Sequence, residues 1–238
     1  MSDTRATSTR IVLVRHGEPL CNINGVVGGH IGCTGLSEKG FDQASKLRDR
    51  LASTKELASA EALYSSMLRR SIDTARVIAP SVGDGTLQVV ERCDFCELHP
   101  GEGDGLAWKD FTQRYGVPDW DARPLLPVAP GGESWVGFVD RATSALESLA
   151  DAHRGGLVVV VCHGGIIEAS MLSFLEISTK TRPLGLPTTY TSMTEWEHDG
   201  SRWQLDRYND IAQLGGPHEA QRTGAHRPRR EAEPAQQA

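Results

Sequence analysis

The 238-residue chain lacks several features that would assign it to a broad class of protein. It has no surplus of basic residues: 25 Lys and Arg stand against 31 Asp and Glu, which gives a net charge of −6. Binding to nucleic acid or to a membrane surface requires a basic face, so we expect neither. No stretch approaches the roughly 20 apolar residues of a membrane span. The first ten residues hold charged side chains and no apolar segment, so we expect no secretory signal.

Cysteine is also scarce. The five cysteines, at positions 21, 33, 93, 96 and 162, are an odd and sparse set, which is typical of a reduced, cytoplasmic protein. Cys93 and Cys96 have the spacing of half a zinc knuckle, but no second cysteine pair follows them. We therefore expect no metal site and no cofactor.

Apolar residues are nearly absent from the two ends of the chain. Residues 1–9 are rich in Ser and Thr, and we expect a flexible N-terminus there. Residues 215–238 cannot bury enough surface to offset the entropy of ordering them, so we expect a disordered tail. Residues 10–214 then form one domain, since no repeat or linker interrupts them.

Strand-like and helix-like segments alternate within this domain. Strands are expected at 10–14, 62–64, 87–90 and 157–161, with two edge strands near 190–197 and 202–207. Helices are expected to begin after Ser37 and to cover about 67–79, 106–115, 133–153 and 165–175. This alternation predicts an α/β fold, a three-layer α/β/α sandwich with a mostly parallel central sheet.

Two junctions between a strand and a loop share one design. Arg15-His16-Gly17 follows the apolar run 11–14, and His163-Gly164-Gly165 follows the apolar run 157–161. Ligands of open α/β sheets bind at the carboxyl ends of strands, where a glycine lets the backbone approach closely. An isolated Arg-His pair is also compatible with a solvated turn. Two histidines in matching contexts instead indicate one shared site, provided that the strands are neighbours.

A third strand end, at Ser65 and Ser66, leads into a helix that carries Arg69 and Arg70 in its first turns. A guanidinium near helix-start amides suits an anion. We expect one of the two arginines to contribute to the site and the other to lie on a solvated face.

Several separated motifs resemble those of the histidine phosphatase superfamily, in its phosphoglycerate mutase-like branch, over roughly residues 10–205. They are Arg15-His16-Gly17-Glu18 with Asn22; Leu36-Ser37-x-x-Gly40-x-x-Gln43-Ala44; Tyr64-Ser65-Ser66-x-Leu68-x-Arg70-x-x-x-Thr74-Ala75; Glu97-x-x-x-Gly101-Glu102-x-x-Gly105-Leu106; Gly131-Gly132-Glu133-Ser134; and His163-Gly164-Gly165. The family's arginine falls on Arg70 and leaves Arg69 outside the motif. Six motifs in the right order are a specific signal.

The resemblance implies a metal-independent phosphatase that acts on a small-molecule phosphate ester. His16 would be the nucleophile that forms a phosphohistidine, and Glu97 would protonate the leaving oxygen. The remaining implied site residues grip the phosphate: Arg15, Arg70 and His163, with Gly17, Asn22 and Gly164 as further contacts.

The sequence departs from the family pattern around the outer pocket. Met67 and Glu168 replace a common aspartate and arginine, and the acid loop also carries Glu102 and Asp104. We therefore expect a neutral or cationic leaving group. The alternatives are a mutase-type phosphotransferase and a phospholigand-binding module without catalysis. The edge strands near 190–207 could pair across a homodimer.

Overall fold

The computed structural model describes residues 8–177 and 185–215. The expected disordered tail lies outside these residues except for Gly215, as do residues 1–7 of the expected flexible N-terminus. Ser8 and Thr9 are buried, and the first strand begins at Thr9, one residue before the expected boundary.

One six-stranded sheet forms the centre of the molecule, in the order β3-β2-β4-β1-β5-β6. Its strands are β1 (Thr9–Arg15), β2 (Ala60–Ser65), β3 (Val89–Glu91), β4 (Leu157–Cys162), β5 (Met193–His198) and β6 (Trp203–Asp210). The first four strands in this order run parallel, whereas β5 is antiparallel to both β1 and β6. The expected mostly parallel sheet is confirmed.

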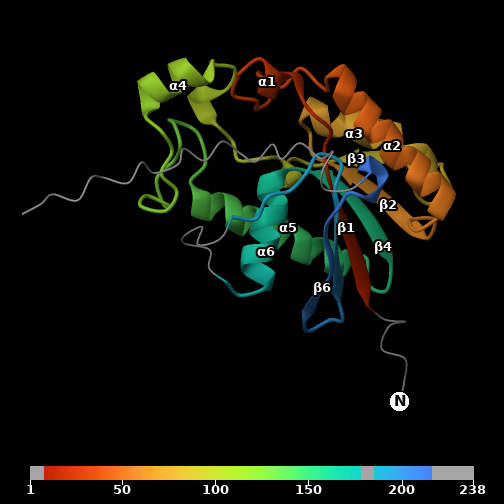
Figure 1. Cartoon of the computed structure of the whole chain (residues 1–238). Coiled ribbons are helices and arrows are strands. Elements are labelled where there is room, and N and C mark those ends of the chain that lie inside the picture. The colour runs from red at the N-terminus through yellow and green to blue at the C-terminus, as the bar shows by residue number, and fades with distance from the viewer. Residues whose placement is uncertain (1–7, 178–184, 216–238) are drawn as a thin grey trace, which may run out of the picture.

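Helices cover both faces of this sheet. They are α1 (Leu20–Ile23), α2 (Glu38–Thr54), α3 (Arg69–Ile78), α4 (Trp108–Tyr115), α5 (Trp135–Ala152) and α6 (Gly164–Phe174). Figure 1 shows α2 and α3 on one face and α5 and α6 on the other, with α1 and α4 beyond the carboxyl ends of the parallel strands. The three-layer α/β/α sandwich is therefore confirmed.

The alternation of side chains along β1 explains the two helical layers, because successive residues of a strand point to opposite faces. Ile11 and Leu13 belong to the core beneath α5 and α6. Val12 and Val14 belong to the core beneath α2 and α3. The run 157–161 in β4 is buried on both faces for the same reason.

The expectation of two edge strands near the end of the domain was wrong for β5. This strand lies between β1 and β6, so the sheet edges are β3 and β6. The polar residues of β5 are compatible with this central place because they have partners. Glu195, for example, is buried and forms ion pairs with Arg10 and Arg207.

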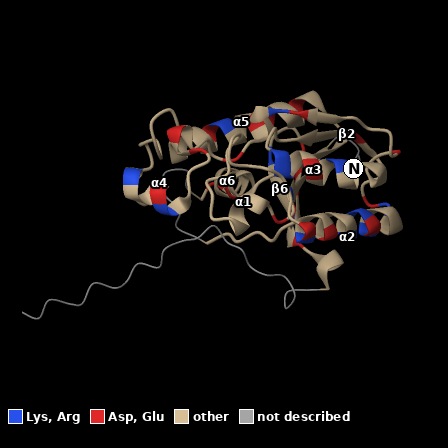
Figure 2. Cartoon of the chain, turned by 90° about the horizontal axis from the view of Figure 1, so that it is seen from above, with Lys and Arg blue, Asp and Glu red and all other residues tan. Residues whose placement is uncertain are grey.

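The described helices do not present faces of one charge. Lys109, Asp110 and Arg114 mix both signs along α4, and Figure 2 shows the same alternation of signs on α2. None of the described helices combines the length and the apolar character that crossing a bilayer requires.

Candidate active site

The two histidines meet because their strands are neighbours. β1 pairs with β4 in a register that sets Arg15 opposite Cys162, so His16 and His163 leave the sheet side by side. Their ring centroids are 5.0 Å apart, and both side chains are buried. The structure thus brings together the two imidazoles that the sequence places 147 positions apart.

Arg70 completes this pair from the first turn of α3. Its Nε lies 3.1 Å from His16 Nε2 and 3.3 Å from His163 Nδ1, and its Nη1 donates to the Gly28 carbonyl at 2.6 Å. Arg69 points elsewhere, since its Nε bonds Asp73 on the same helix at 2.7 Å. The expected division between the two arginines is what the structure shows.

Hydrogen bonds define which nitrogen of each histidine faces the site. His16 Nδ1 lies 2.6 Å from the Gly17 carbonyl, which only accepts, so Nδ1 carries the proton. The lone pair of His16 is then on Nε2, directed at Arg70. By the same argument His163 accepts from Arg70 at Nδ1 and donates from Nε2 to Ser66 Oγ, which is 2.6 Å away.

The surroundings keep both imidazoles neutral. Burial is the main cause that lowers the pKa of His16 well below its ordinary value, and the charges of Arg70 and Arg15 lower it further. Burial also lowers the pKa of His163, again with help from Arg70. Desolvation therefore contributes more to the neutrality of His16 than the neighbouring arginines do.

Arg15 lies against an aromatic residue that sequence reasoning missed. Its guanidinium stands over the ring of Tyr190, 4.4 Å from the centroid, and this ring is 5.6 Å from that of His16. The Tyr190 hydroxyl accepts a hydrogen bond from Asn22 Nδ2 at 2.8 Å, so Asn22 reaches the site through Tyr190. No motif surrounds Tyr190 in the sequence. Only the pairing of β5 with β1 brings its segment here.

Glu97 reaches the start of α6 from the loop after β3. One carboxylate oxygen accepts the backbone N–H of Gly165 at 3.1 Å. A Cβ at position 165 would lie 2.1 Å from the other oxygen, so this close approach requires glycine. After Tyr190, Gly165 is therefore a second residue at the candidate site that was not expected there. Gly164, which was expected, begins α6 beside the Arg15 guanidinium.

Gly17 has a structural reason to be glycine as well. A Cβ there would lie 2.5 Å from the Gly40 carbonyl oxygen, at the start of α2. Its backbone N–H donates to Thr74 Oγ1 at 3.0 Å. These two contacts hold the loop after β1 between α2 and α3, with His16 directly after the carboxyl end of β1.

Two of the acidic residues that suggested a neutral or cationic leaving group have other partners. The Asp104 carboxylate accepts three backbone N–H groups, those of Gly29, Ile31 and Gly32, at 2.8–2.9 Å. Glu102 is exposed and accepts from the Tyr115 hydroxyl at 3.2 Å. Asp104 thus organises the 29–32 loop, and its charge is largely compensated by these donors.

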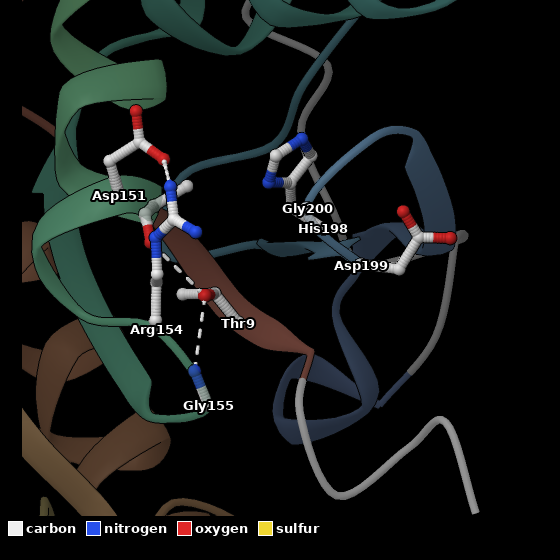
Figure 3. A pocket seen from close by; sticks show the side chains of 8 residues that line it. Thr9, Asp151, Arg154, Gly155, His198, Asp199 and Gly200 are labelled. Carbon is white, nitrogen blue, oxygen red and sulfur yellow. Dashed lines mark hydrogen bonds and ion pairs between the residues drawn. The ribbon is translucent and has the colours of Figure 1, made fainter. Parts of the chain in front are cut away.

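A pocket elsewhere on the molecule lies at the opposite end of the sheet. Figure 3 shows it at the beginning of β1, with Thr9, Arg154 and His198 among the lining residues. Arg154 pairs with Asp151 there, and Thr9 donates to the Ala150 carbonyl. One strand length, about 20 Å, separates this end of the sheet from the histidines. The pocket therefore does not belong to the candidate active site.

Known proteins with similar sequences identify the family. Residues 11–211 match the family model of the histidine phosphatase superfamily (branch 1). A metal-independent phosphoserine phosphatase of Arabidopsis thaliana is 33% identical over 211 residues, which make up 87% of this chain and 83% of that protein. Phosphoglycerate mutase-like protein 4 of the same plant is 30% identical over 86% of each chain.

A solved structure agrees with these relatives. The mycobacterial glucosyl-3-phosphoglycerate phosphatase superposes with a TM-score of 0.68 and 26% identity, covering 85% of this chain and 99% of that one. The match over nearly the whole described domain confirms the resemblance seen in the sequence. The chain belongs to the histidine phosphatase superfamily.

Proposed function

We propose that this protein is a metal-independent phosphatase that hydrolyses a small-molecule phosphomonoester through a phosphohistidine on His16. The observation that carries the proposal is the His16–Arg70–His163 cluster, in which one guanidinium nitrogen lies within 3.3 Å of both imidazoles. A phosphoryl group bound there would meet a nucleophilic nitrogen and cationic donors together.

The first step uses the unprotonated nitrogen of His16. Nε2 attacks phosphorus in line while the bond from phosphorus to the ester oxygen breaks. The proton on Nδ1 stays in place, and the Gly17 carbonyl stabilises the positive charge that the ring gains on phosphorylation. Arg15 and Arg70 offset the charge of the equatorial oxygens, a task that a metal ion performs in other phosphotransfer enzymes.

Glu97 supplies and then retrieves one proton. It protonates the departing ester oxygen in the first step and accepts a proton from water in the second, when water attacks the phosphohistidine. Inorganic phosphate leaves, and His16 regains its lone pair. The contact of Glu97 with Gly165 supports this role, because it places the carboxylate at the end of the sheet where β4 leads into His163.

Replacement of His16 by alanine tests the proposal. We expect H16A to lose turnover of phosphomonoesters and to keep measurable binding of inorganic phosphate, because Arg15 and Arg70 remain. Acid quenching of the wild-type enzyme with ³²P-labelled substrate should trap an acid-labile phosphoenzyme that H16A does not form. Turnover of H16A equal to that of the wild type would refute the mechanism.

The leaving group is proposed to be neutral or cationic. Asp104 no longer supports this proposal, because its carboxylate binds backbone amides. The support that remains is the 25–33 segment, which contains no lysine or arginine that could bind an anionic leaving group. Initial rates with phosphoserine, a sugar monophosphate and 2,3-bisphosphoglycerate decide the matter. Preference for the bisphosphate over both monophosphates would reject this assignment without affecting the role of His16.

A mutase remains the second candidate, since several relatives carry mutase or mutase-like names. A mutase must return the phosphoryl group to a highly charged product, for which a run of basic residues is useful. Segment 107–130 contains a short helix, α4, and a proline-rich loop without such a run. Release of free phosphate in proportion to substrate consumed favours the phosphatase, whereas phosphate exchange without release favours the mutase.

A cytoplasmic location and a homodimer are also proposed. The five cysteines, which all lie in the described part of the chain, form no disulfide there, as suits a reducing compartment. β6 is an edge strand and could pair with a second copy. Sedimentation of the purified protein measures its oligomeric state and so tests the homodimer.

A further inference from the structure

Four side chains that the proposed reaction does not use gather beside the acid loop: His30, Cys93, Cys96 and His99. Their donor atoms all lie within 4.8 Å of one another. Cys93 Sγ is 3.7 Å from His30 Nε2 and 3.4 Å from His99 Nε2. We propose that these four residues hold a structural zinc ion.

The separations suit tetrahedral zinc. Bonds of about 2.3 Å to sulfur and about 2.0–2.1 Å to nitrogen place two ligand atoms about 3.3–3.8 Å apart. Both measured distances from Cys93 to the histidines fall within this range. The widest separation in the cluster is at most 4.8 Å, so it needs to shorten by at most about 1.5 Å to reach this range.

The donor set also selects the metal and its role. Two thiolates and two imidazoles form the Cys₂His₂ set that prefers zinc over hard cations such as magnesium or calcium. Four protein ligands leave no open position for substrate or water, which is characteristic of a structural site. The ion would therefore take no part in phosphoryl transfer, and the reaction proposed above stays metal-independent in its chemistry.

The contacts outside the cluster are those of a metal-bound histidine. His99 directs Nε2 at Cys93, and its Nδ1 lies 3.5 Å from a carboxylate oxygen of Glu133. A carboxylate on the second ring nitrogen fixes the orientation of ligating histidines in many zinc sites. Glu133 is itself held in place, because Arg141 donates to both of its oxygens at 2.7 Å.

Arg141 also shapes the turn that carries the two cysteines. Its Nη1 donates to the carbonyl oxygens of Cys93, Asp94 and Cys96 at 3.3, 2.8 and 3.1 Å. Cys96 is fully buried, whereas Cys93 is partly open to solvent. Hydrogen bonds from Arg141 thus hold the turn without a metal, and one thiol remains accessible to an entering ion.

The ion would connect two loops that border the active site. Glu97 lies between Cys96 and His99, so three ligands fix the backbone on both sides of the catalytic carboxylate. His30 is two residues from Gly28, whose carbonyl accepts from Arg70. A zinc ion here would hold the acid loop against the loop that supports Arg70, which positions Glu97 without touching the substrate.

From the sequence we expected no metal site, because no second cysteine pair follows Cys93 and Cys96. The two remaining ligands are histidines instead. His99 follows Cys96 by three residues, and His30 comes from a loop 63 positions before Cys93. Only the fold brings that loop to the cysteines.

The test measures metal in the intact protein. The full-length enzyme, expressed with zinc in the medium and dialysed, should contain about one zinc per chain by mass spectrometry. Replacement of zinc by cobalt should produce the visible bands of tetrahedral coordination with thiolate-to-cobalt charge transfer. Zinc should raise the Tm of the wild type, since binding to the folded state stabilises it.

Variants identify the ligands. C93S and H30N, which change partly or fully exposed side chains, should lose zinc and the zinc-dependent rise in Tm while keeping the circular dichroism spectrum of the wild type. The matched controls C21S and H153N should retain zinc; like His99, His153 has a carboxylate partner, Glu61, on its Nδ1.

Three outcomes would overturn the proposal: absence of zinc after loading, equal zinc content in C93S and the wild type, or a disulfide between Cys93 and Cys96 in place of the metal. None of these would affect the phosphohistidine test on H16A, so failure of the zinc site and failure of the proposed function are distinguishable.

Discussion

At the scale of single residues, the reactivity of His16 depends on one short contact to its own neighbour. The Gly17 carbonyl fixes the proton on Nδ1 and leaves Nε2 with a lone pair. Burial and Arg70 then disfavour protonation of Nε2, which keeps the lone pair that the proposed nucleophilic attack requires. The environment of one side chain thus determines its tautomer, its charge and its direction.

The neutral histidines predict how stability changes with pH. Their folded-state pKa values lie well below the unfolded value of about 6.5, so below that pH the unfolded chain binds more protons than the folded one. As the pH falls from about 6.5 to its folded-state pKa, each histidine should lower the free energy of unfolding by up to about 1.4 kcal/mol per pH unit. Urea unfolding at pH 7.5, 6.5 and 5.5 measures this slope.

The variant H16A supplies the control for that slope. Because it lacks one of the two buried histidines, its stability should fall less steeply with acid than that of the wild type. Equal slopes in the two proteins would contradict the assignment of His16 as a neutral buried group.

Glu97 predicts a dependence on the leaving group. Glu97→Gln cannot donate a proton, so kcat for an alkyl phosphate should fall by about 10²–10⁴-fold. The loss should be much smaller for p-nitrophenyl phosphate, whose phenolate departs without a proton. Steady-state rates with both esters give the comparison, and Glu102→Gln, in the same loop but exposed, serves as the control. An equal loss for both esters would exclude proton donation.

At the scale of elements, the ends of helices and strands deliver the site residues. α2 begins after Ser37, whose hydroxyl oxygen accepts the N–H of Gly40 at 3.0 Å. The same hydroxyl donates to Glu18, two residues after His16 in the loop that follows β1. The start of α2 is therefore connected to the loop that carries His16, and the helix cap contributes to both stability and position.

Ser37→Ala should lower the free energy of unfolding by about 1 kcal/mol, as loss of an N-terminal cap does. Chemical denaturation of the variant beside the wild type measures the change. Ser148→Ala is the control, since this exposed hydroxyl only donates to the Ser144 carbonyl within α5. If both variants lost the same stability, the cap would not be the cause.

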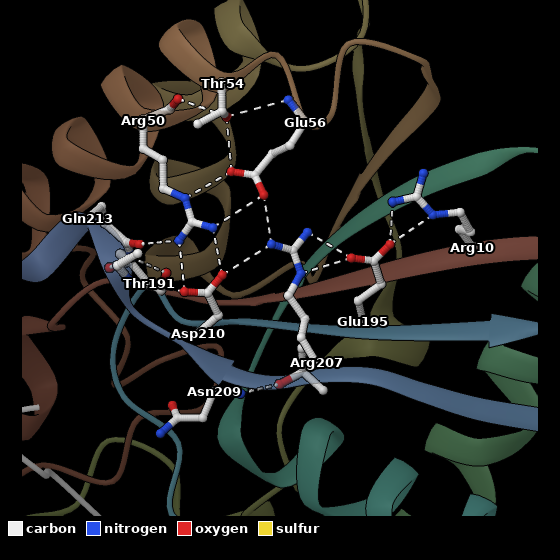
Figure 4. Close-up of polar contacts among 12 residues, drawn as sticks. Arg10, Arg50, Thr54, Glu56, Thr191, Glu195, Arg207, Asn209, Asp210 and Gln213 are labelled. Carbon is white, nitrogen blue, oxygen red and sulfur yellow. Dashed lines mark hydrogen bonds and ion pairs between the residues drawn. The ribbon is translucent and has the colours of Figure 1, made fainter. Parts of the chain in front are cut away.

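At the scale of the whole molecule, a network of ion pairs fastens the antiparallel hairpin β5–β6 to the rest of the fold. Figure 4 shows Arg207 of β6 between Glu195 of β5 and Glu56, which follows α2. Arg50 of α2 joins the same network through Glu56 and Asp210. Because β5 pairs with β1, this network also supports the strand that leads into His16.

Arg207→Gln should lower the free energy of unfolding by on the order of 2–3 kcal/mol. The pairs are partly buried, so the loss is smaller than for a fully buried pair and larger than for a surface pair. Arg154→Gln removes an exposed pair with Asp151 and should change stability by less than about 1 kcal/mol. Thermal unfolding of the two variants in the same buffer compares them; a loss for Arg207→Gln no greater than for Arg154→Gln would show that the network contributes little.

Much of this organisation was predictable from the sequence. The apolar runs at 11–14 and 157–161, each followed one residue later by His-Gly, predicted two strands whose histidines share one site if the strands are neighbours, and the pairing of β1 with β4 meets that condition. Ser37 predicted the start of α2, and the spacing of the third motif separated Arg70 from Arg69. These signals are local, because a strand, a cap or a strand end is encoded by residues next to one another.

The tertiary structure alone decided the rest. Tyr190 reaches Arg15 only because β5 lies between β1 and β6 in the sheet. Asp104 was expected near the leaving group, but its carboxylate instead accepts hydrogen bonds from three backbone amides. His30 meets Cys93 across 63 residues of sequence. The sequence by itself determined which residues can perform phosphoryl chemistry, since that depends on side-chain type and local spacing. Which distant residues surround them depends on strand order and loop packing, and no short stretch of sequence records either one.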